Sequence, residues 1–513
     1  MNNKNQIKLG AILSYLSLFI NNFLGLVYTP FLLSKLGQSE YGLYSLITQI
    51  IGYLTVLDLG FGNAIVVYTA KYRAKGEKEN EEKLHGMFIV IFCVIGIIAT
   101  LIGLLLYFNV NRIFGATMTS DELSKAKVMM LILTFNLAIT FPFSVFSSIV
   151  TAYERFVFAK VRTIIRNILM PIIMIPLLIM GYKSIAMVVV VTALNIYILA
   201  SNTLYCFRKL NIKIKFGKFD MKLLKEIFAY SFFIFLSVIV DKINWSVDQF
   251  VLGAVAGTIA VSIYSVAAQF NNIYLSFSSA INGLLLPKVS KMVAKEESNE
   301  QISDLFIKTG RLQYLVMALV ITGFVLFGKQ FIVLWAGNEY VISYYVACIL
   351  MIPVTIPLIQ NVGISILQAK NLHKFRSVLY ALIALANIAA SIPLAKMWGG
   401  IGSAIGTAAS LIIGNGIIIN IYYMKRAKIN IPKFWIQIIK MTLPIIPLVI
   451  ATIFILKYVN LTNWIALAIG IGIYAVLYAV IAYIFIMNKY EKELLLKPMY
   501  KIKNKIKRKK VSA

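Results

Sequence analysis

Long apolar segments alternate with short polar connections along almost the whole chain. A helix needs about 20 apolar residues to cross the hydrocarbon core of a bilayer. Fourteen segments have this character: 9–34, 41–68, 87–109, 126–150, 163–181, 184–205, 227–252, 257–286, 312–335, 341–368, 377–395, 401–423, 437–457 and 463–487. These runs are too long for barrel strands and lack strand-type alternation. The pattern therefore predicts an all-α polytopic membrane protein with about 14 transmembrane helices.

Composition supports this class. Of the 513 residues, 60% are hydrophobic and 14% are charged, whereas soluble domains have about 45–50% apolar and about 25% charged residues. The connections between the apolar segments leave no room for a soluble domain. We therefore expect an integral membrane protein and not an enzyme.

The basic residues are distributed unevenly between the two sides of the predicted membrane. Lys and Arg number 50 against 20 acidic residues, and 41 of the 50 lie at the N-terminus, at the C-terminus or in every second connection. Basic connections stay in the cytoplasm, so both termini are expected there. This explanation makes a nucleic-acid partner unnecessary, and the basic tail 497–510 is expected to contact anionic membrane lipid.

An internal repeat divides the chain. At an offset of 220 residues, 41–50 aligns with 261–270 and 70–77 with 290–297, giving seven identities. The offset spans six predicted helices, an even number, so the halves run in the same direction, as in transporters built from parallel repeats. We expect two parallel, pseudo-symmetric six-helix bundles at 1–226 and 227–426, followed by two additional transmembrane helices and the tail at 427–513.

Polar residues inside the predicted spans indicate a candidate binding site. Asp241, Asn244 and Asp248 lie within about 60° of each other on the seventh helix, and Lys242 flanks them. Charged side chains in a membrane are costly and face protein or water. In the repeat, Asn21 of helix 1 aligns with Asp241, and the second and eighth helices add one amide each, Gln49 and Gln269. The side chains could line a hydrated cavity or only hold the bundle together by hydrogen bonds.

Three arginines surround the predicted cytoplasmic connection between helices 4 and 5: Arg155, Arg162 and Arg166. A planar guanidinium can bind phosphate through two parallel hydrogen bonds. The alternative is that these residues serve only the charge rule and contact anionic lipid.

The sequence shows no motif typical of a catalytic, cofactor-binding or metal site. The three cysteines form no CxxC motif, and His85 and His373 are far apart, so we expect no catalytic, cofactor-binding or metal residues. A stripe of small residues at intervals of four, in the twelfth predicted helix, predicts close helix packing: Gly402, Gly406, Ser410 and Gly414.

Four motifs resemble the polysaccharide-unit flippases of O-antigen and capsule synthesis. These belong to the multidrug/oligosaccharidyl-lipid/polysaccharide exporter superfamily. The motifs are KLGQSEYGLY at 35–44, LDLGFGN at 57–63, LWAGNEY at 334–340 and GGIGSAIG at 399–406. The resemblance covers nearly the whole chain. It implies a V-shaped pair of six-helix bundles that works by alternating access.

The resemblance also implies a cargo: oligosaccharide units on undecaprenyl pyrophosphate, moved from the inner to the outer leaflet of the bacterial cytoplasmic membrane. Related lipid II flippases have a strongly cationic cavity with arginine on helix 1. This chain has asparagines on helix 1, and two acids with one lysine on helix 7. A capsule, O-antigen or teichoic-type glycan is therefore favoured over lipid II, and the particular glycan is left open.

Two other functions remain possible at this stage. A drug or organic-cation antiporter of the same superfamily could bind H⁺ or Na⁺ at Asp241 and Asp248. A membrane glycan polymerase usually needs a sizeable extramembrane loop, which this chain lacks. We expect a monomer, and the coupling to H⁺, Na⁺ or membrane potential is left open.

The charge distribution predicts the result of cysteine labelling. In a cysteine-free background, single cysteines near positions 80, 215, 295 and 505 should be protected from an external, impermeant thiol reagent. Cysteines near 118 and 337 should react. External labelling at 505 would contradict an even number of helices with both termini in the cytoplasm.

Overall fold

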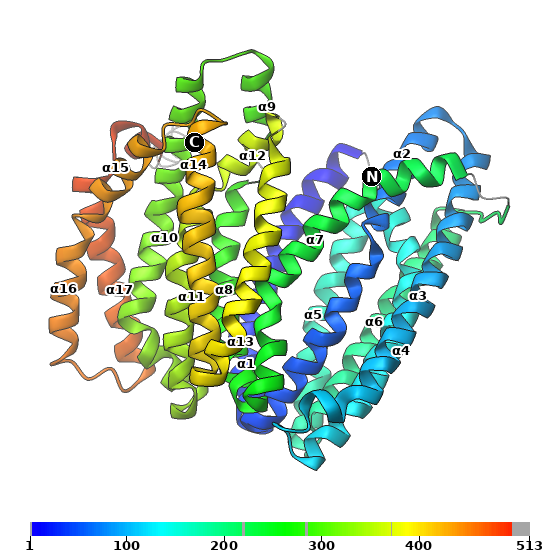
Figure 1. Ribbon diagram of the computed structural model, residues 1–513, viewed down its shortest axis with the longest axis horizontal. Coiled ribbons are helices and arrows are strands. Elements are labelled where there is room, and N and C mark those ends of the chain that lie inside the picture. The colour runs from blue at the N-terminus through cyan, green and yellow to red at the C-terminus, as the bar shows by residue number, and fades with distance from the viewer. Residues whose placement is uncertain (1–2, 218–220, 283–285, 371, 495–513) are drawn as a thin grey trace, which may run out of the picture. The chain divides into compact units, whose positions relative to one another are not determined.

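The computed structural model describes residues 3–217, 221–282, 286–370 and 372–494, and these residues form helices and short connections without a strand (Figure 1). Ten segments within the described residues are long and apolar enough to cross a membrane. The expectation of an all-α polytopic membrane protein is confirmed.

Two of these segments each contain a break at a glycine. Ile12–Lys75 has 64 residues and Val378–Lys425 has 48. The first is interrupted by the non-helical Gly37 (φ 74°), the second by Trp398 and Gly399. Each break lies between two predicted spans, so each segment covers two of them. Helices α7 (Met221–Val255) and α8 (Gly257–Asn282) lie at the seventh and eighth predicted spans.

The chain divides into two compact units. Unit 1 comprises Met1–Val266 and Ala384–Gly406, and unit 2 comprises Ala267–Ile383 and Thr407–Ala513. The boundaries predicted from the repeat, 226/227 and 426/427, remain a prediction.

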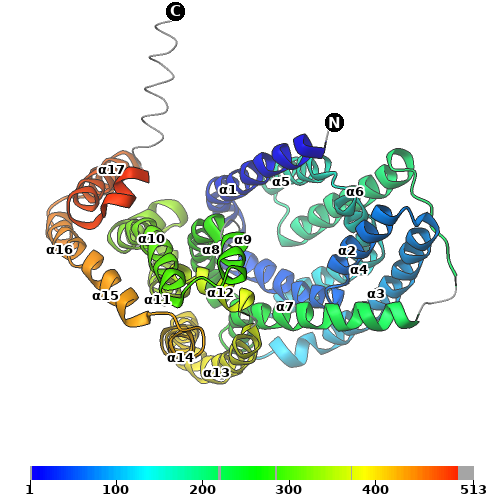
Figure 2. The ribbon, with the colours of Figure 1, turned by 90° about the horizontal axis from the view of Figure 1, so that it is seen from above.

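Unit 1 contains most of the N-terminal helices. They are α1 (Asn3–Leu54), α2 (Phe61–Lys75), α3 (Lys78–Phe114), α4 (Ser120–Ala152), α5 (Phe156–Ile179), α6 (Ser184–Lys209), α7, the first part of α8 and the middle of α13 (His373–Leu411). Helix α4 packs against both α3 and α6, and α5 packs along α1 (Figures 1 and 2). Phe88 and Phe92 of α3 are fully buried and pack with Phe61 of α2.

Unit 2 contains the rest of α8 and α13, together with the C-terminal helices. Its other elements are α9 (Leu286–Ala294), α10 (Asn299–Ala336), α11 (Val341–Ile359), α12 (Val362–Ala369), the π-helix Ile412–Ile418, α14 (Ile419–Lys425), α15 (Ile431–Thr442), α16 (Ile445–Leu456), α17 (Trp464–Ile481) and the π-helix Ala482–Ile486. Helix α10 packs against α11, α15, α16 and α17 and so connects the last helices to the unit (Figure 2).

A buried ion pair fixes the end of the chain in unit 2. The guanidinium of Arg311 in α10 donates to both carboxylate oxygens of Glu491 at 2.7 and 2.9 Å. It also donates to Gln437 of α15 and to the carbonyl of Ile486. Both charged side chains are buried, with exposed fractions of 8% and 2%. Every partner of this guanidinium belongs to the segment after residue 426, so the pair attaches that segment to α10.

The small-residue stripe of α13 and the π-helix packs as predicted. A Cβ atom at Gly402 would lie 1.9 Å from the carbonyl oxygen of Leu394, and one at Gly414 would lie 2.0 Å from the side chain of Ile383. No side chain fits at these approaches. The prediction of close packing is therefore confirmed at both glycines.

The backbone repeats with the same offset of 220 residues as the sequence. Gly37 and Gly257 have φ angles of 74° and 79°. Gly37 lies between the first and second predicted spans, and Gly257 is the first residue of the eighth. Gly76 and Glu296 also have positive φ (75° and 55°), and each follows a helix with equivalent hydrogen bonds from its own amide and the next. The matching turns support the internal repeat independently of residue identity.

The Arg311–Glu491 pair generates a stability prediction. Glu491→Ala should lower the free energy of unfolding by about 3–5 kcal/mol, because it leaves a buried guanidinium without its counter-charge. Glu493→Ala is the matched control, since Glu493 is exposed two residues away. Thermal unfolding of the purified protein in detergent measures both. Equal melting temperatures for the two variants would contradict the role given to this pair.

Candidate functional site

A carboxylate lies within the helical interior of unit 1. Asp248 of α7 is buried, with an exposed fraction of 4%. Its Oδ2 accepts a hydrogen bond from the Tyr264 hydroxyl at 2.5 Å, and its Oδ1 accepts one from the Ser403 hydroxyl at 2.7 Å. These donors come from α8 and α13, so three helices meet at one acidic group, which we call the Asp248 group. Ionisable residues inside a membrane are costly and usually functional.

A cation lies in the same unit, on α5. Arg166 is eleven residues beyond Arg155, or about 16 Å along the helix from its predicted cytoplasmic start. Its charge interacts electrostatically with the hydroxyl of Tyr44 in α1, which in turn interacts with the hydroxyl of Tyr28. Arg166 forms no ion pair with any residue that the structure describes. We call Tyr28, Tyr44 and Arg166 the Arg166 group.

Two buried hydroxyls in this region have unused hydrogen-bonding capacity. The hydroxyl oxygens of Tyr28 and Tyr53, both on α1, are buried and have no hydrogen-bond partner among the described residues. The Tyr53 hydroxyl interacts electrostatically with Asp248. Since buried polar atoms are usually hydrogen-bonded, both hydroxyls are available to a polar ligand or to water.

The three arginines predicted around the start of α5 form a row on one face. Positions 155, 162 and 166 differ by about 40° or less in helical rotation. The guanidinium of Arg162 lies 4.6 Å from the ring centre of Phe158 and 5.7 Å from that of Tyr197. The Nε atom of Arg155 is buried and has no partner among the described residues. The row therefore leads from the predicted cytoplasmic end of α5 to the Arg166 group.

Other polar groups at the predicted cytoplasmic ends are occupied by contacts within the protein. The Tyr153 hydroxyl donates to Glu81 at 2.7 Å. Burial raises the pKa of Tyr153, and this hydrogen bond raises it further. In unit 2 the ammonium of Lys370 donates to Asn299 and to the carbonyl of Ala427, and burial lowers the pKa of Lys370. Neither group is placed to receive a cargo.

The other predicted site residues differ in burial and in the unit to which they belong. Gln49 of α1 and Lys242 of α7 are half-buried in unit 1, whereas Asn21 is exposed on α1. Gln269 is half-buried in α8, in the part that belongs to unit 2. The predicted roles of Asp241 and Asn244 concern side chains outside the described residues. The site assignment of all these residues remains a prediction.

Sequence reasoning missed several members of the two groups. Ser403 was not predicted as a candidate, and neither was the neighbouring Tyr53. Tyr28 carried a signal, because it occupies the position equivalent to Asp248 in the repeat. Tyr44 and Tyr264 carried a signal, because they occupy equivalent positions in the repeat. Ser403 follows Gly402 of the small-residue stripe, whose pattern indicates helix packing, so nothing local indicated a carboxylate partner.

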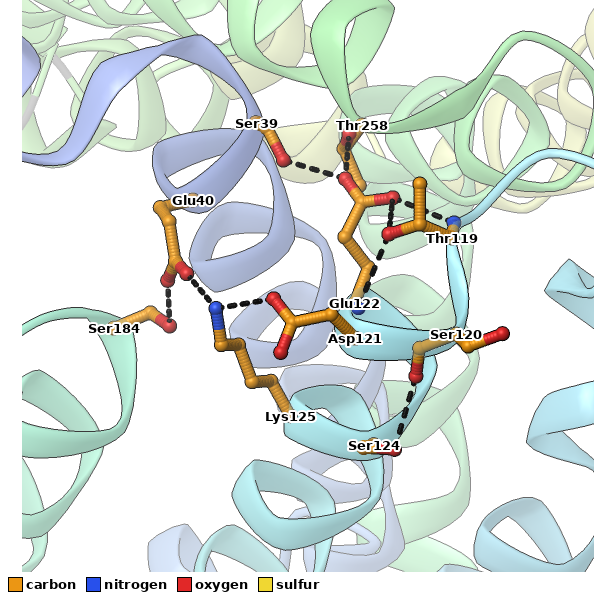
Figure 3. Close-up of polar contacts among 10 residues, drawn as sticks. All are labelled: Ser39, Glu40, Thr119, Ser120, Asp121, Glu122, Ser124, Lys125, Ser184 and Thr258. Carbon is orange, nitrogen blue, oxygen red and sulfur yellow. Dashed lines mark hydrogen bonds and ion pairs between the residues drawn. The ribbon is translucent and has the colours of Figure 1, made fainter.

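A second polar network ties the predicted external ends of the unit 1 helices together (Figure 3). One carboxylate oxygen of Glu122 in α4 accepts hydrogen bonds from Ser39 of α1 at 2.5 Å and Thr258 of α8 at 2.7 Å. The other accepts from the amide of Thr119, which caps α4. We call these four residues the Glu122 network.

An ion-pair cluster lies beside the Glu122 network (Figure 3). The ammonium of Lys125 lies 2.5 Å from Glu40 of α1 and 2.5 Å from Asp121. The hydroxyl of Ser184, at the start of α6, donates to Glu40. Together the two clusters connect α1, α4, α6 and α8 at one end of the unit.

Glycines allow the helices to approach at this end. A Cβ at Gly42 of α1 would lie 1.9 Å from the carbonyl oxygen of Thr258, and one at Gly253 would lie 2.5 Å from the Leu46 side chain. The hydroxyl of Thr117 donates to the carbonyl of Gly253 at 2.8 Å. The turn between α7 and α8 is therefore packed directly against α1 and the connection before α4.

Comparison with solved structures agrees with this architecture. The lipid II flippase MurJ in an inward closed conformation is similar over 96% of this chain and 99% of its own, with a TM-score of 0.71 and 18% identity. An inward-facing multidrug resistance MATE transporter is similar over 77% of this chain and 92% of its own, with a TM-score of 0.65 and 13% identity. Identities this low establish the fold alone.

The apolar spans and the all-helical fold define an α-helical, multi-pass membrane protein with polar groups in its interior. A family model described as polysaccharide biosynthesis protein matches residues 7–293, more than half of the chain. The chain belongs to this family. A Shigella flexneri protein assigned as an O-antigen transporter is 22% identical over 388 residues, covering 75% of this chain and 90% of the relative. The resemblance inferred from the sequence motifs is confirmed.

The close approach at Gly42 generates a stability prediction. Gly42→Ala should lower the free energy of unfolding by about 1–3 kcal/mol, since the added methyl group forces α1 and α8 apart. Gly52→Ala on the same helix is the control, because nothing lies within 4 Å of its added Cβ. It should be neutral or stabilising by about 0.5–1 kcal/mol. Thermal unfolding in detergent checks both, and a Gly42→Ala protein as stable as Gly52→Ala would refute the contact.

Proposed function

We propose that this protein is a flippase. It moves oligosaccharide units linked to undecaprenyl pyrophosphate from the inner to the outer leaflet of the bacterial cytoplasmic membrane, by alternating access, for cell-surface polysaccharide synthesis. Both termini lie in the cytoplasm, and the protein works as a monomer without catalysing a covalent reaction. Membership of the polysaccharide biosynthesis family supports this class of cargo.

The row of arginines on α5 is the observation that carries the proposal. Lipid-linked sugars made in the cytoplasm present a diphosphate next to the lipid. Guanidinium groups bind phosphate oxygens in pairs. The buried Nε of Arg155 has no partner among the described residues, and Arg166 forms no ion pair with any of them. The row gives the diphosphate a path from the cytoplasmic end of α5 towards mid-membrane.

The Asp248 group and the tyrosines of α1 provide complementary chemistry for sugar. Hydroxyl groups of a saccharide can donate to the carboxylate of Asp248 and accept from the unpartnered hydroxyls of Tyr28 and Tyr53. The lipid tail needs no binding site in this scheme, because it can stay in the bilayer. The particular glycan, whether capsule, O-antigen or teichoic-type, is not part of the proposal.

A cation-coupled antiporter is the second candidate. A buried carboxylate that accepts hydrogen bonds from two hydroxyls, as Asp248 does, can bind H⁺ or Na⁺, and MATE transporters have the same fold. In a flippase the same residue could couple transport to an ion gradient. Uptake of an organic cation by vesicles containing the purified protein would favour the antiporter.

Precursor binding tests the flippase directly. Replacing Arg162 and Arg166 together by lysine should weaken binding of undecaprenyl-pyrophosphate glycan in detergent by roughly tenfold, since an ammonium cannot form the paired hydrogen bonds. Arg166→Lys alone should account for most of the loss, because the Arg162 guanidinium already lies against Phe158 and Tyr197.

Lys160→Arg is the matched control, because Lys160 lies on α5 about 140° away from the arginine row. Its affinity for the precursor should equal that of the wild type. If arginines 162 and 166 served only the charge distribution, lysine would replace them fully. Wild-type affinity of the double variant would therefore end the proposal for this row.

A further inference from the structure

A pocket in unit 2 lies at the ends of α10 and α16. It has a volume of about 560 Å³ and lies between the last turns of α10 and the connection from α16 to α17. Its polar lining comes from Lys329 and Gln330 on one side and from Lys457, Asn460 and Thr462 on the other. Apolar side chains, including Val333 and Leu461, complete the wall.

The pocket is positively charged, although it lies outside the predicted cytoplasmic regions, where few basic residues occur. Only nine of the 50 basic residues lie outside the predicted cytoplasmic regions, and Lys329 and Lys457 are two of these nine. No acidic residue lines the pocket. Among the described residues neither lysine forms an ion pair, and the ammonium of Lys457 lies 5.2 Å from the ring centre of Phe454. Two lysines thus line one pocket that has no acidic residue in its lining, on the side of the predicted membrane where basic residues are few.

Exposed aromatic residues place the pocket at the depth of the lipid head groups. Phe454, Tyr458 and Trp464 adjoin or line it and have exposed fractions of 58%, 89% and 48%. Aromatic residues gather where a membrane helix meets the interface between hydrocarbon and water. A ligand at this depth can present a phosphate to the lysines and its apolar part to Val333 and Leu461.

We propose that this pocket binds the head group of an anionic phospholipid in the leaflet opposite the chain termini. The two ammonium groups bind the phosphate, and the amides of Gln330 and Asn460 and the hydroxyl of Thr462 bind the glycerol hydroxyls. The occupant is a resident lipid and differs from the transported cargo. All of its lining residues belong to unit 2, and none is part of the arginine row, so the site can exist whether or not the proposed function is correct.

The test is a titration of the full-length protein in detergent with phosphatidylglycerol or phosphatidylcholine, with bound lipid counted by native mass spectrometry. The wild type should retain phosphatidylglycerol in preference to phosphatidylcholine. Lys329→Gln with Lys457→Gln should lower the affinity for phosphatidylglycerol by about tenfold or more. Each variant is first checked for a monodisperse elution profile.

Lys35→Gln with Lys396→Gln is the matched control. It removes the same charge from exposed lysines that are predicted on the same side but do not line the pocket. Its affinity should stay within twofold of the wild type. Equal losses in the two double variants, or no preference for phosphatidylglycerol in the wild type, would overturn the site. Displacement of the lipid by equimolar glycerol 3-phosphate would reassign the pocket to a soluble phosphate.

Discussion

Hydrocarbon offers no hydrogen-bond partner to a peptide group, and this constraint determines most of what the chain does. Helices satisfy their backbone internally, so the apolar segments form helices wherever they cross the membrane. Between α1 and α2 the helix is interrupted by a 3₁₀ turn at Thr55–Asp58 and by Leu59 and Gly60 in the left-handed conformation. There the carboxylate of Asp58 accepts a hydrogen bond from the amide of Gly62, near the start of α2. Hydroxyls within the spans likewise bond to carbonyls four residues earlier, as Thr100 does to Gly96.

Because charges are costly in hydrocarbon, a charged side chain within the protein either forms a structural ion pair or remains available to a ligand. Arg311 and Glu491 neutralise one another, and Gln437 and a backbone carbonyl satisfy the remaining donors. Such a closed set can hold a helix in place but has nothing left for a ligand. Arg166 has no such counter-charge among the described residues, and its charge interacts with the hydroxyl of Tyr44. The open arrangement of donors distinguishes a candidate binding region from a structural ion pair.

Comparing equivalent turns in the two halves of the repeat shows where the fold requires glycine. Gly37 and Gly257 are equivalent positions with positive φ, and both are glycine, because a residue with a side chain is strained in this conformation. Gly76 and Glu296 have equivalent backbone geometry, yet the second half uses a residue with a side chain. At Gly257 a Cβ would also lie 2.9 Å from the carbonyl of Thr117, whereas nothing lies within 4 Å of a Cβ at Gly76. Among these turns, glycine is thus required most strongly where backbone segments pack closely.

The sequence by itself determined the fold class, the breaks at Gly37 and Gly399 between predicted spans, and the family, since hydropathy and ordered motifs are properties of local segments. It also indicated Asp248 as a candidate, because a charge in an apolar run is conspicuous, and the arginines of α5, because they cluster at a predicted cytoplasmic connection. Only the tertiary structure supplied their partners. Ser403 reaches Asp248 across 155 residues, and no local pattern encodes which helices meet. For the same reason the repeat could align Asn21 with Asp241 but could not give their neighbours: an alignment gives equivalent positions, and packing decides what each position contacts.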